Sequence, residues 1–122
     1  MKKILIVDDD EDILEVVKYL LQSHGFNVST YATGFNVDEV VKNYNPDLIL
    51  LDINLPGKSG TQICKELRHK KLTTPIILFS AHADRSKVIA ESNADDFIEK
   101  PFEIDHLINT ISSHLNLVLT VF

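Results

Sequence analysis

The sequence predicts an α/β fold, a doubly wound sandwich of three layers in which helices cover both faces of a parallel sheet. Five short apolar runs alternate with segments whose apolar residues recur at helical spacing, and this alternation continues along the whole chain. Three of the five runs are apolar at every position, which is typical of strands buried on both faces. The 122 residues, 44% hydrophobic and 25% charged, fit one compact domain.

The expected strands are short, and polar or turn-forming residues follow each of them. The runs that are apolar throughout read ILIV, LILL and IILF. In chain order, the strands are expected at residues 4–7, 28–31, 48–51, 76–79 and 97–98.

The first expected helix begins at Glu11, and its apolar residues, Val16 and Val17 among them, follow the spacing of an amphipathic helix. Acidic residues at its start favour the positive end of the helix, and Gly25 is the expected stop. The apolar tail, NLVLTVF, is expected to extend the last helix onto the core, with an exposed segment for a partner as the alternative. The later helices are expected at residues 37–44, between 60 and 71, at 84–92 and at 104–115.

Composition and charge exclude several classes of function. The formal net charge of −6 argues against nucleic-acid binding by this domain. The one cysteine, Cys64, rules out an internal disulfide and indicates a reducing compartment. The first apolar run is too short for a signal peptide, and no segment approaches the roughly 20 apolar residues of a membrane span. We therefore expect a cytoplasmic protein that binds neither nucleic acid nor membrane.

Chemically active side chains follow four of the five expected strands. Asp8 and Asp9 come directly after the first, Asp52 after the third, Ser80 after the fourth, and Lys100 shortly after the fifth. In an open parallel sheet, ligands gather at the carboxyl ends of the strands. The sequence therefore predicts that acids, a hydroxyl and an ammonium meet at one edge.

Three carboxylates brought together repel one another, and burial disfavours each of them, so they need either protons or a cation. A cluster of oxygen ligands suits Mg²⁺, and a nearby lysine is well matched to phosphate. These are the parts of a phosphoryl-transfer site. A carboxylate among the ligands can act as the nucleophile and form an acyl phosphate, and we expect Asp52 to do so.

Four blocks of the chain, ILIVDDD, LILLDINLPGKSG, IILFSA and NADDFIEKPF, resemble the signature blocks of response-regulator receiver domains in the same order. The resemblance, to chemotaxis-regulator-like receivers of two-component signalling, covers essentially the whole chain. It implies one receiver domain over residues 1–122. It also implies five helices around a five-stranded parallel sheet of order 2-1-3-4-5, the flavodoxin-like arrangement.

The resemblance implies a role for each acidic residue of the site. Asp52 matches the phosphorylated aspartate and is also a metal ligand. Asp9 is expected to bind Mg²⁺ (or Mn²⁺) directly and Asp8 mainly through water, and Asn54 would offer its backbone carbonyl to the metal. Asn54 and His82 occupy the two variable positions that tune dephosphorylation in the family.

The resemblance also implies a switch. Ser80 matches the hydroxyl residue that is drawn to the phosphate, and Phe97 matches the aromatic residue that swings inward in response. Lys100 matches the lysine that pairs with the phosphoryl group, and the Lys100–Pro101 peptide bond is expected to be cis. Ser80 stands where threonine is commoner, so its rotamer is less constrained.

In the family, the phosphate donor is a histidine kinase or a phosphotransfer protein, and this chain is expected to use one of them. Output is expected through the face formed by the helix at 84–92, the strand at 97–98 and the helix at 104–115, toward a protein target or in a homodimer. Such a chain is a signalling module that catalyses only its own phosphorylation and slow dephosphorylation. It would be a stand-alone receiver or the receiver of a longer regulator.

Two other classes of function match the sequence less well. A phosphatase of the haloacid-dehalogenase type also places a nucleophilic aspartate after a strand, but it needs a second aspartate two residues later. Here that position is Asn54, which cannot transfer a proton. A nucleotide- or flavin-binding domain would need a glycine-rich loop after the first strand, where this chain has the phosphate-repelling DDDED.

Overall fold

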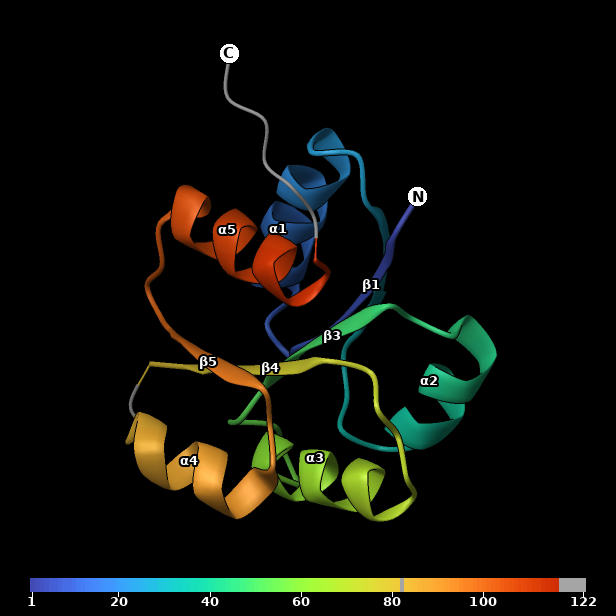
Figure 1. Ribbon diagram of the computed structural model, residues 1–122, viewed down its shortest axis with the longest axis vertical. Helices are drawn as coiled ribbons and strands as arrows, with labels where there is room; N and C mark the ends of the chain where they lie inside the picture. The colour runs from blue at the N-terminus through green and yellow to red at the C-terminus, as the bar shows by residue number, and fades with distance from the viewer. Residues whose placement is uncertain (82, 117–122) are drawn as a thin grey trace.

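The computed structural model describes residues 1–81 and 83–116 as alternating strands and helices (Figure 1). The expected alternation is confirmed. The elements are β1 (Lys3–Val7), α1 (Glu11–Ser23), β2 (Asn27–Tyr31), α2 (Val37–Tyr44), β3 (Leu48–Asp52), α3 (Gly60–His69), β4 (Ile76–Ser80), α4 (Arg85–Ser92), β5 (Asp96–Glu99) and α5 (Ile104–His114).

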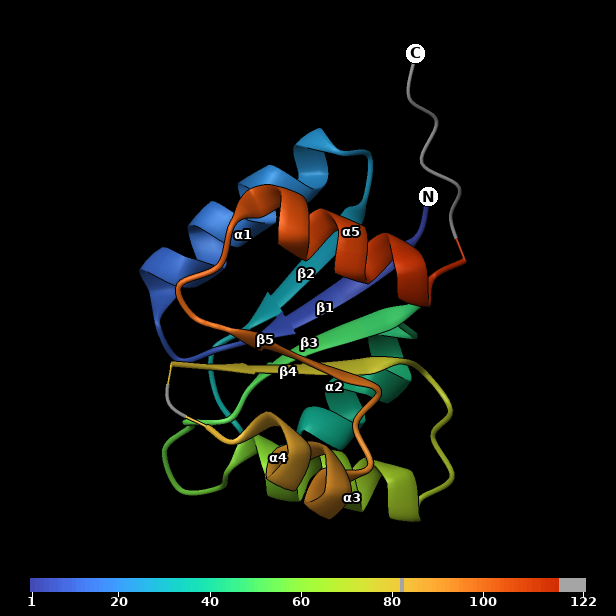
Figure 2. The same ribbon diagram turned by 60° about the vertical axis from the view of Figure 1, so that its left-hand side comes forward.

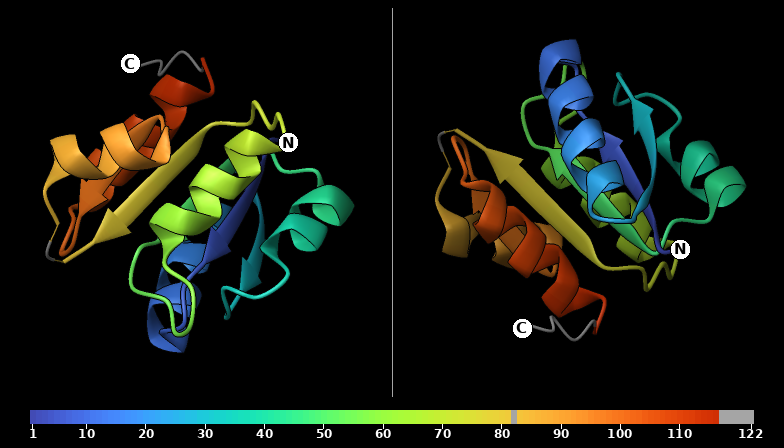
Figure 3. Two further views of the ribbon diagram at one scale, coloured as in Figure 1. Left: turned by 90° about the horizontal axis from the view of Figure 1, so that it is seen from below. Right: turned by 90° about the horizontal axis from the view of Figure 1, so that it is seen from above.

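All neighbouring strands pair in parallel, in the order β2-β1-β3-β4-β5, which is the order expected from the resemblance. Helices α1 and α5 cover one face of the sheet, and α2, α3 and α4 cover the other (Figures 1 and 3). The three runs that are apolar throughout lie in β1, β3 and β4, the interior strands. The edge strands β2 and β5 are partly exposed.

The core consists of two apolar layers, one on each face of the sheet. Successive residues of a strand point to opposite faces, so Ile4 and Ile6 pack with α1 and α5, whereas Leu5 and Val7 pack with α2, α3 and α4. Cys64 is fully buried in the second layer.

The helix ends follow from local hydrogen bonds. The Asp10 carboxylate caps α1 by accepting bonds from the backbone N–H groups of Asp12 and Ile13. Beyond the other end, Gly25 has a φ of +88°, which suits the expected stop. In the described part of the chain, no helix is long and apolar enough to cross a membrane.

Of the two valines named in the expected first helix, Val17 is buried against the sheet, whereas Val16 is 57% exposed. Two expectations need correction. Asp52 and Ser80 are the last residues of their strands rather than the residues after them. The last helix ends at His114, so it does not continue into the tail as expected. Residues 117–122 of that tail lie outside the described residues.

The turn between β3 and α3 brings the start of the helix against the end of the strand. The backbone N–H of Gly60 donates to the carbonyl of Ile53 at 2.9 Å. A Cβ atom on Gly60 would lie 2.1 Å from the carbonyl oxygen of Asp52, a contact with backbone that cannot be relieved by rotating a side chain. A glycine is therefore required where α3 passes the candidate phosphoacceptor.

Replacing this glycine tests how far the close approach supports the fold. Gly60→Ala should lower the free energy of unfolding by about 3 kcal/mol, because overpacking against backbone forces the chain apart. The matched control is Gly25→Ala, where the new methyl group meets nothing within 4 Å and only the positive φ is strained. That variant should lose about 1 kcal/mol. Urea unfolding followed by circular dichroism measures both, and equal losses would contradict the steric account.

Candidate acceptor site at the carboxyl edge of the sheet

The predicted site residues meet where the strands end, at the left side of the sheet in Figure 2. Asp8 follows β1, Asp52 and Ser80 close β3 and β4, and Lys100 follows β5. One carboxylate oxygen each from Asp8, Asp9 and Asp52 lies within 4.8 Å of the other two. Asp8 and Asp52 are buried, at 0% and 3% exposure, whereas Asp9 is exposed. The sheet thus brings the adjacent pair Asp8 and Asp9 together with Asp52, which lies far from them in the sequence.

The Lys100 ammonium lies against two of these acids. Its Nζ donates to Asp8 Oδ2 at 2.9 Å and is 3.6 Å from Asp52 Oδ1. The same nitrogen stands 4.5 Å from the centre of the Phe79 ring, so a cation–π contact also orients it. One ammonium faces three carboxylates, and the cluster therefore keeps an excess of negative charge.

The environment of Asp52 disfavours its ionised form. Burial raises the pKa of this carboxyl, and the neighbouring carboxylate of Asp8 raises it further. The backbone N–H of Asn54, which donates to Asp52 Oδ1 at 3.2 Å, and the Lys100 ammonium lower the pKa but do not cancel the rise. A divalent cation beside the cluster would relieve this cost.

The donor set fits a hard cation. The converging atoms are carboxylate oxygens, the ligands that Mg²⁺ prefers, and the cluster is open to water on the side of Asp9. Both carboxylate oxygens of Asp8 already accept a hydrogen bond, Oδ1 from the backbone N–H of Asp10 at 2.9 Å and Oδ2 from Lys100. Asn54, whose carbonyl was expected to help, adjoins the cluster through its bond to Asp52.

A contact that the sequence reasoning missed joins Asn54 to Ser80. Ser80 is buried at 1% exposure, and its Oγ accepts a hydrogen bond from the Asn54 side-chain amide at 2.9 Å. The sequence carried one indirect signal of it. Asn54 follows the end of β3 by two residues, next to the end of β4, so its side chain can reach that strand.

The remaining predicted residues lie as follows. Phe97 is 4% exposed, stands opposite Leu78 in the pairing of β4 with β5, and packs in the core layer beneath α4. The Lys100–Pro101 bond is cis, as expected. His82 lies outside the described residues.

An apolar groove borders the site on the side of α1. The exposed stripe of α1, which includes Val16, forms one wall, and the segment after β5 forms the other. Lys100, whose ammonium contacts Asp8 and Asp52, is among the lining residues. The residues that line the groove are Asp12, Ile13, Val16, Val17, Leu20, Ala81, Lys100, Pro101, Phe102 and Ile104.

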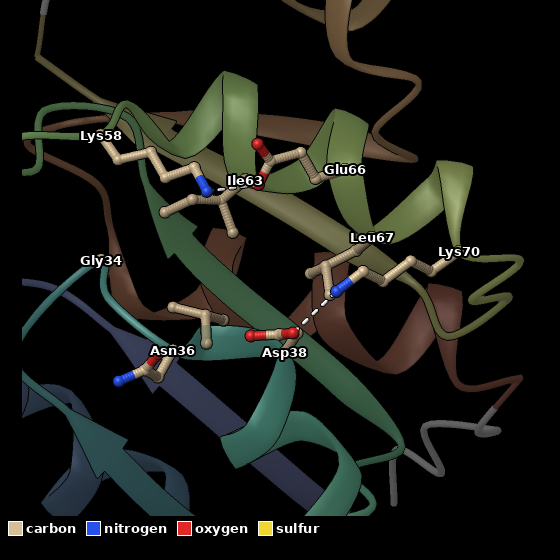
Figure 4. A pocket seen from close by; sticks show the side chains of 9 residues that line it. Gly34, Asn36, Asp38, Lys58, Ile63, Glu66, Leu67 and Lys70 are labelled. Carbon is tan, nitrogen blue, oxygen red and sulfur yellow. Dashed lines mark hydrogen bonds and ion pairs between the residues drawn. The ribbon is translucent and has the colours of Figure 1, made fainter.

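A second hollow, of about 100 Å³, lies between α2 and α3 (Figure 4). Its charged groups pair with one another: Lys58 Nζ is 2.5 Å from Glu66 Oε2, and Lys70 Nζ is 2.7 Å from Asp38 Oδ2. The described residues that line it include none of the predicted site residues. The carboxyl edge is therefore the better candidate for chemistry.

A family model for the response regulator receiver domain matches residues 4–112. The chain belongs to this family. It is a receiver domain of the kind found in two-component response regulators, a signalling module rather than a classical enzyme. The phosphatase alternative finds no support in these comparisons.

The chain is also similar in sequence to a transcriptional regulatory protein. The chain is 41% identical over 103 residues to the alkaline phosphatase synthesis transcriptional regulatory protein PhoP of Bacillus subtilis (strain 168), a match over 83% of this chain and 43% of PhoP. It thus spans less than half the length of that relative.

Solved structures agree with this assignment over nearly the whole chain. The response regulator TrrA of Thermotoga maritima, in complex with Mg²⁺ and BeF, is 35% identical, with a TM-score of 0.85 over 93% of this chain and 99% of that chain. The receiver domain of the Francisella response regulator 1452 is 27% identical, with a TM-score of 0.88 over 95% and 98%.

Asp52→Asn tests the electrostatic cost of the site. A carboxyl whose pKa is raised in the fold destabilises it once the pH exceeds the ordinary carboxyl pKa. Without divalent cations at pH 7, the variant should therefore melt about 3–5 °C higher than the unaltered chain. Calorimetric scans measure the difference at pH 7 and at about pH 3, where the Asp52 carboxyl of the unaltered chain is protonated in both the folded and the unfolded state. It should disappear at the lower pH and shrink at pH 7 when Mg²⁺ is added.

A variant that is less stable at pH 7, or one that keeps its advantage at the acidic pH, would contradict this account of Asp52.

Proposed function

We propose that residues 1–122 form one phospho-accepting receiver domain, in which Asp52 takes a phosphoryl group from the phosphohistidine of a histidine kinase or a phosphotransfer protein. The observation that carries this proposal is the setting of Asp52. Its carboxylate is buried beside two other acids, with the Lys100 ammonium 3.6 Å away. Such an arrangement has little structural value of its own, because it leaves charge uncompensated inside the fold.

The transfer is a displacement at phosphorus. A carboxylate oxygen of Asp52 attacks the phosphorus atom, the bond from phosphorus to the donor's imidazole nitrogen breaks, and that nitrogen keeps the electron pair. An acyl phosphate then stands on Asp52. Lys100, which the Phe79 ring and Asp8 hold in place, faces the added negative charge.

The acids fit Mg²⁺, or Mn²⁺, and we propose that Asp8, Asp9, Asp52 and the backbone carbonyl of Asn54 hold it. When bound, the cation supplies the positive charge that the phosphoryl oxygens and the carboxylates need. The relative TrrA was solved with Mg²⁺ and BeF, which supports this choice.

The output face in this proposal is α4–β5–α5. The step from the site to this face runs through Ser80, which turns toward the phosphoryl group, and Phe97, which follows it. Only Val88 and Ser92 of α4 are buried, so apolar packing holds this helix weakly. A modest population shift is therefore enough to change the surface offered to a target protein or to a second copy of the chain.

Polar contacts replace the missing apolar packing. Arg85 of α4 donates to the carbonyl of Phe97 at 2.9 Å and pairs with Asp96, and His114 of α5 lies 2.8 Å from the same carboxylate. Burial opposes the ionisation of Asp96, but these partners and the N–H of Phe97 hold its pKa below the usual value. Asp96 is therefore charged at neutral pH and ties both helices to β5.

The donor is proposed to dock in the apolar groove beside α1. Exposed apolar side chains such as Val16 are the usual material of a protein interface. Lys100 lines the groove and contacts Asp52, so a helix lying in the groove could bring its phosphohistidine to Asp52. Histidine kinases act from the cytoplasm, so the proposed location is cytoplasmic. The chain's own catalysis would be limited to its phosphorylation and slow dephosphorylation.

Phosphorylation of Asp52 can be tested directly. After incubation with acetyl phosphate and Mg²⁺, the intact mass of the chain should rise by one phosphoryl group, and Asp52→Asn should show no rise. Removing the divalent cation with EDTA should abolish the modification, because the acids then repel the incoming charge. An equal gain by the variant would end the assignment of Asp52.

Docking can be tested with two exposed apolar residues of α1. Val16 lines the groove, whereas Tyr19, which is 71% exposed, does not. With a phosphorylated histidine phosphotransfer protein that modifies the unaltered chain, Val16→Ser should slow transfer about 5-fold through the lost apolar contact. This loss should exceed any loss seen with acetyl phosphate, and Tyr19→Ser should transfer at the unaltered rate. Equal effects of the two substitutions would refute docking in the groove.

A further inference from the structure

One residue, Asn54, contacts both the candidate acceptor and the candidate switch. Its backbone N–H donates to Asp52 Oδ1 at 3.2 Å, and its side-chain amide donates to Ser80 Oγ at 2.9 Å. Ser80 is almost wholly buried, while Asn54 stands exposed at the mouth of the site. The amide therefore reaches inward from the surface to the hydroxyl.

The bond from Asn54 matters more because residue 80 is a serine rather than a threonine. Threonine has a second heavy atom on Cβ that restricts χ1, whereas serine has none and turns more freely. The main chain of Ser80 is fixed by β4 and by the bond from the Lys100 N–H to its carbonyl at 2.9 Å. The position of the hydroxyl oxygen, by contrast, depends on its hydrogen-bond partners, and the Asn54 amide is one of them.

We propose that Asn54 is a positioning residue that restrains the Ser80 hydroxyl in the unphosphorylated chain. The proposal rests on the proposed function, in which Ser80 turns toward a phosphoryl group on Asp52. That movement stretches or breaks the bond from the amide, so the bond favours the unswitched state. The free energy of this one hydrogen bond is subtracted from the gain that the phosphoryl group offers.

In this proposal, a surface residue controls the equilibrium between the unswitched and the switched state. Removing the amide should make the switched state easier to reach and should tighten the binding of a phosphoryl mimic. A neutral hydrogen bond of ordinary net strength corresponds to about a 2- to 10-fold change in affinity. The effect must depend on the hydroxyl, because the amide is proposed to act only through it.

A double-mutant cycle on the full chain tests this. The dissociation constant of beryllofluoride is measured by calorimetry at saturating Mg²⁺ for the unaltered chain, Asn54→Ala, Ser80→Ala and the double variant. Asn54→Ala should bind about 2- to 10-fold more tightly than the unaltered chain. In the Ser80→Ala background, the same substitution should change nothing. The matched control, Asn43→Ala, removes an exposed amide from α2 and should leave the affinity unchanged.

The outcomes separate the two proposals. If the unaltered chain binds no beryllofluoride, the proposed function fails, and the restraint fails with it. If the unaltered chain binds but Asn54→Ala weakens the affinity or leaves it unchanged, only the restraint is overturned. The same holds if the affinity shifts equally in both backgrounds, because Asn54 would then act without the Ser80 hydroxyl.

Discussion

The structure depends on keeping two carboxylates buried at one end of a parallel sheet with a single ammonium beside them. Asp8 and Asp52 lie at 0% and 3% exposure, and Lys100 reaches both. Each neighbouring feature lessens the cost of this arrangement: the Asp10 and Asn54 N–H groups donate to the acids, and the Phe79 ring orients the ammonium. What remains uncompensated is negative charge, so the site favours an added positive charge such as that of a divalent cation.

The rest of the fold brings these groups together and holds them. The interior strands β1, β3 and β4 are buried along nearly their whole length, so the ends of β1, β3 and β4 are fixed by packing on both faces of the sheet. The edge strand β5 is less enclosed and carries Phe97 and the approach to Lys100. The acids and Ser80 thus stand at the ends of the well-packed interior strands, whereas Phe97 and the segment that leads to Lys100 belong to the edge strand, next to the weakly packed α4.

The sequence was enough to predict the order of elements and the meeting of the acids, because both follow from local patterns and from the geometry of parallel sheets. It could not show which of two adjacent apolar stripes on α1 is buried, since periodicity places Val16 and Val17 on the same broad face. Nor could it show the bond from Asn54 to Ser80, because a loop side chain finds its partner through the path of the loop. Residue roles such as that of Phe97 came from family resemblance and stay predictions.

Asp96 shows how one carboxylate can connect two helices, α4 and α5, that are separated in the sequence. Its two oxygens are divided between Arg85 of α4 and His114 of α5. Displacing either helix therefore changes the charges around the carboxylate that the other helix contacts. A partner that moved one of these helices would in this way alter a contact of the other.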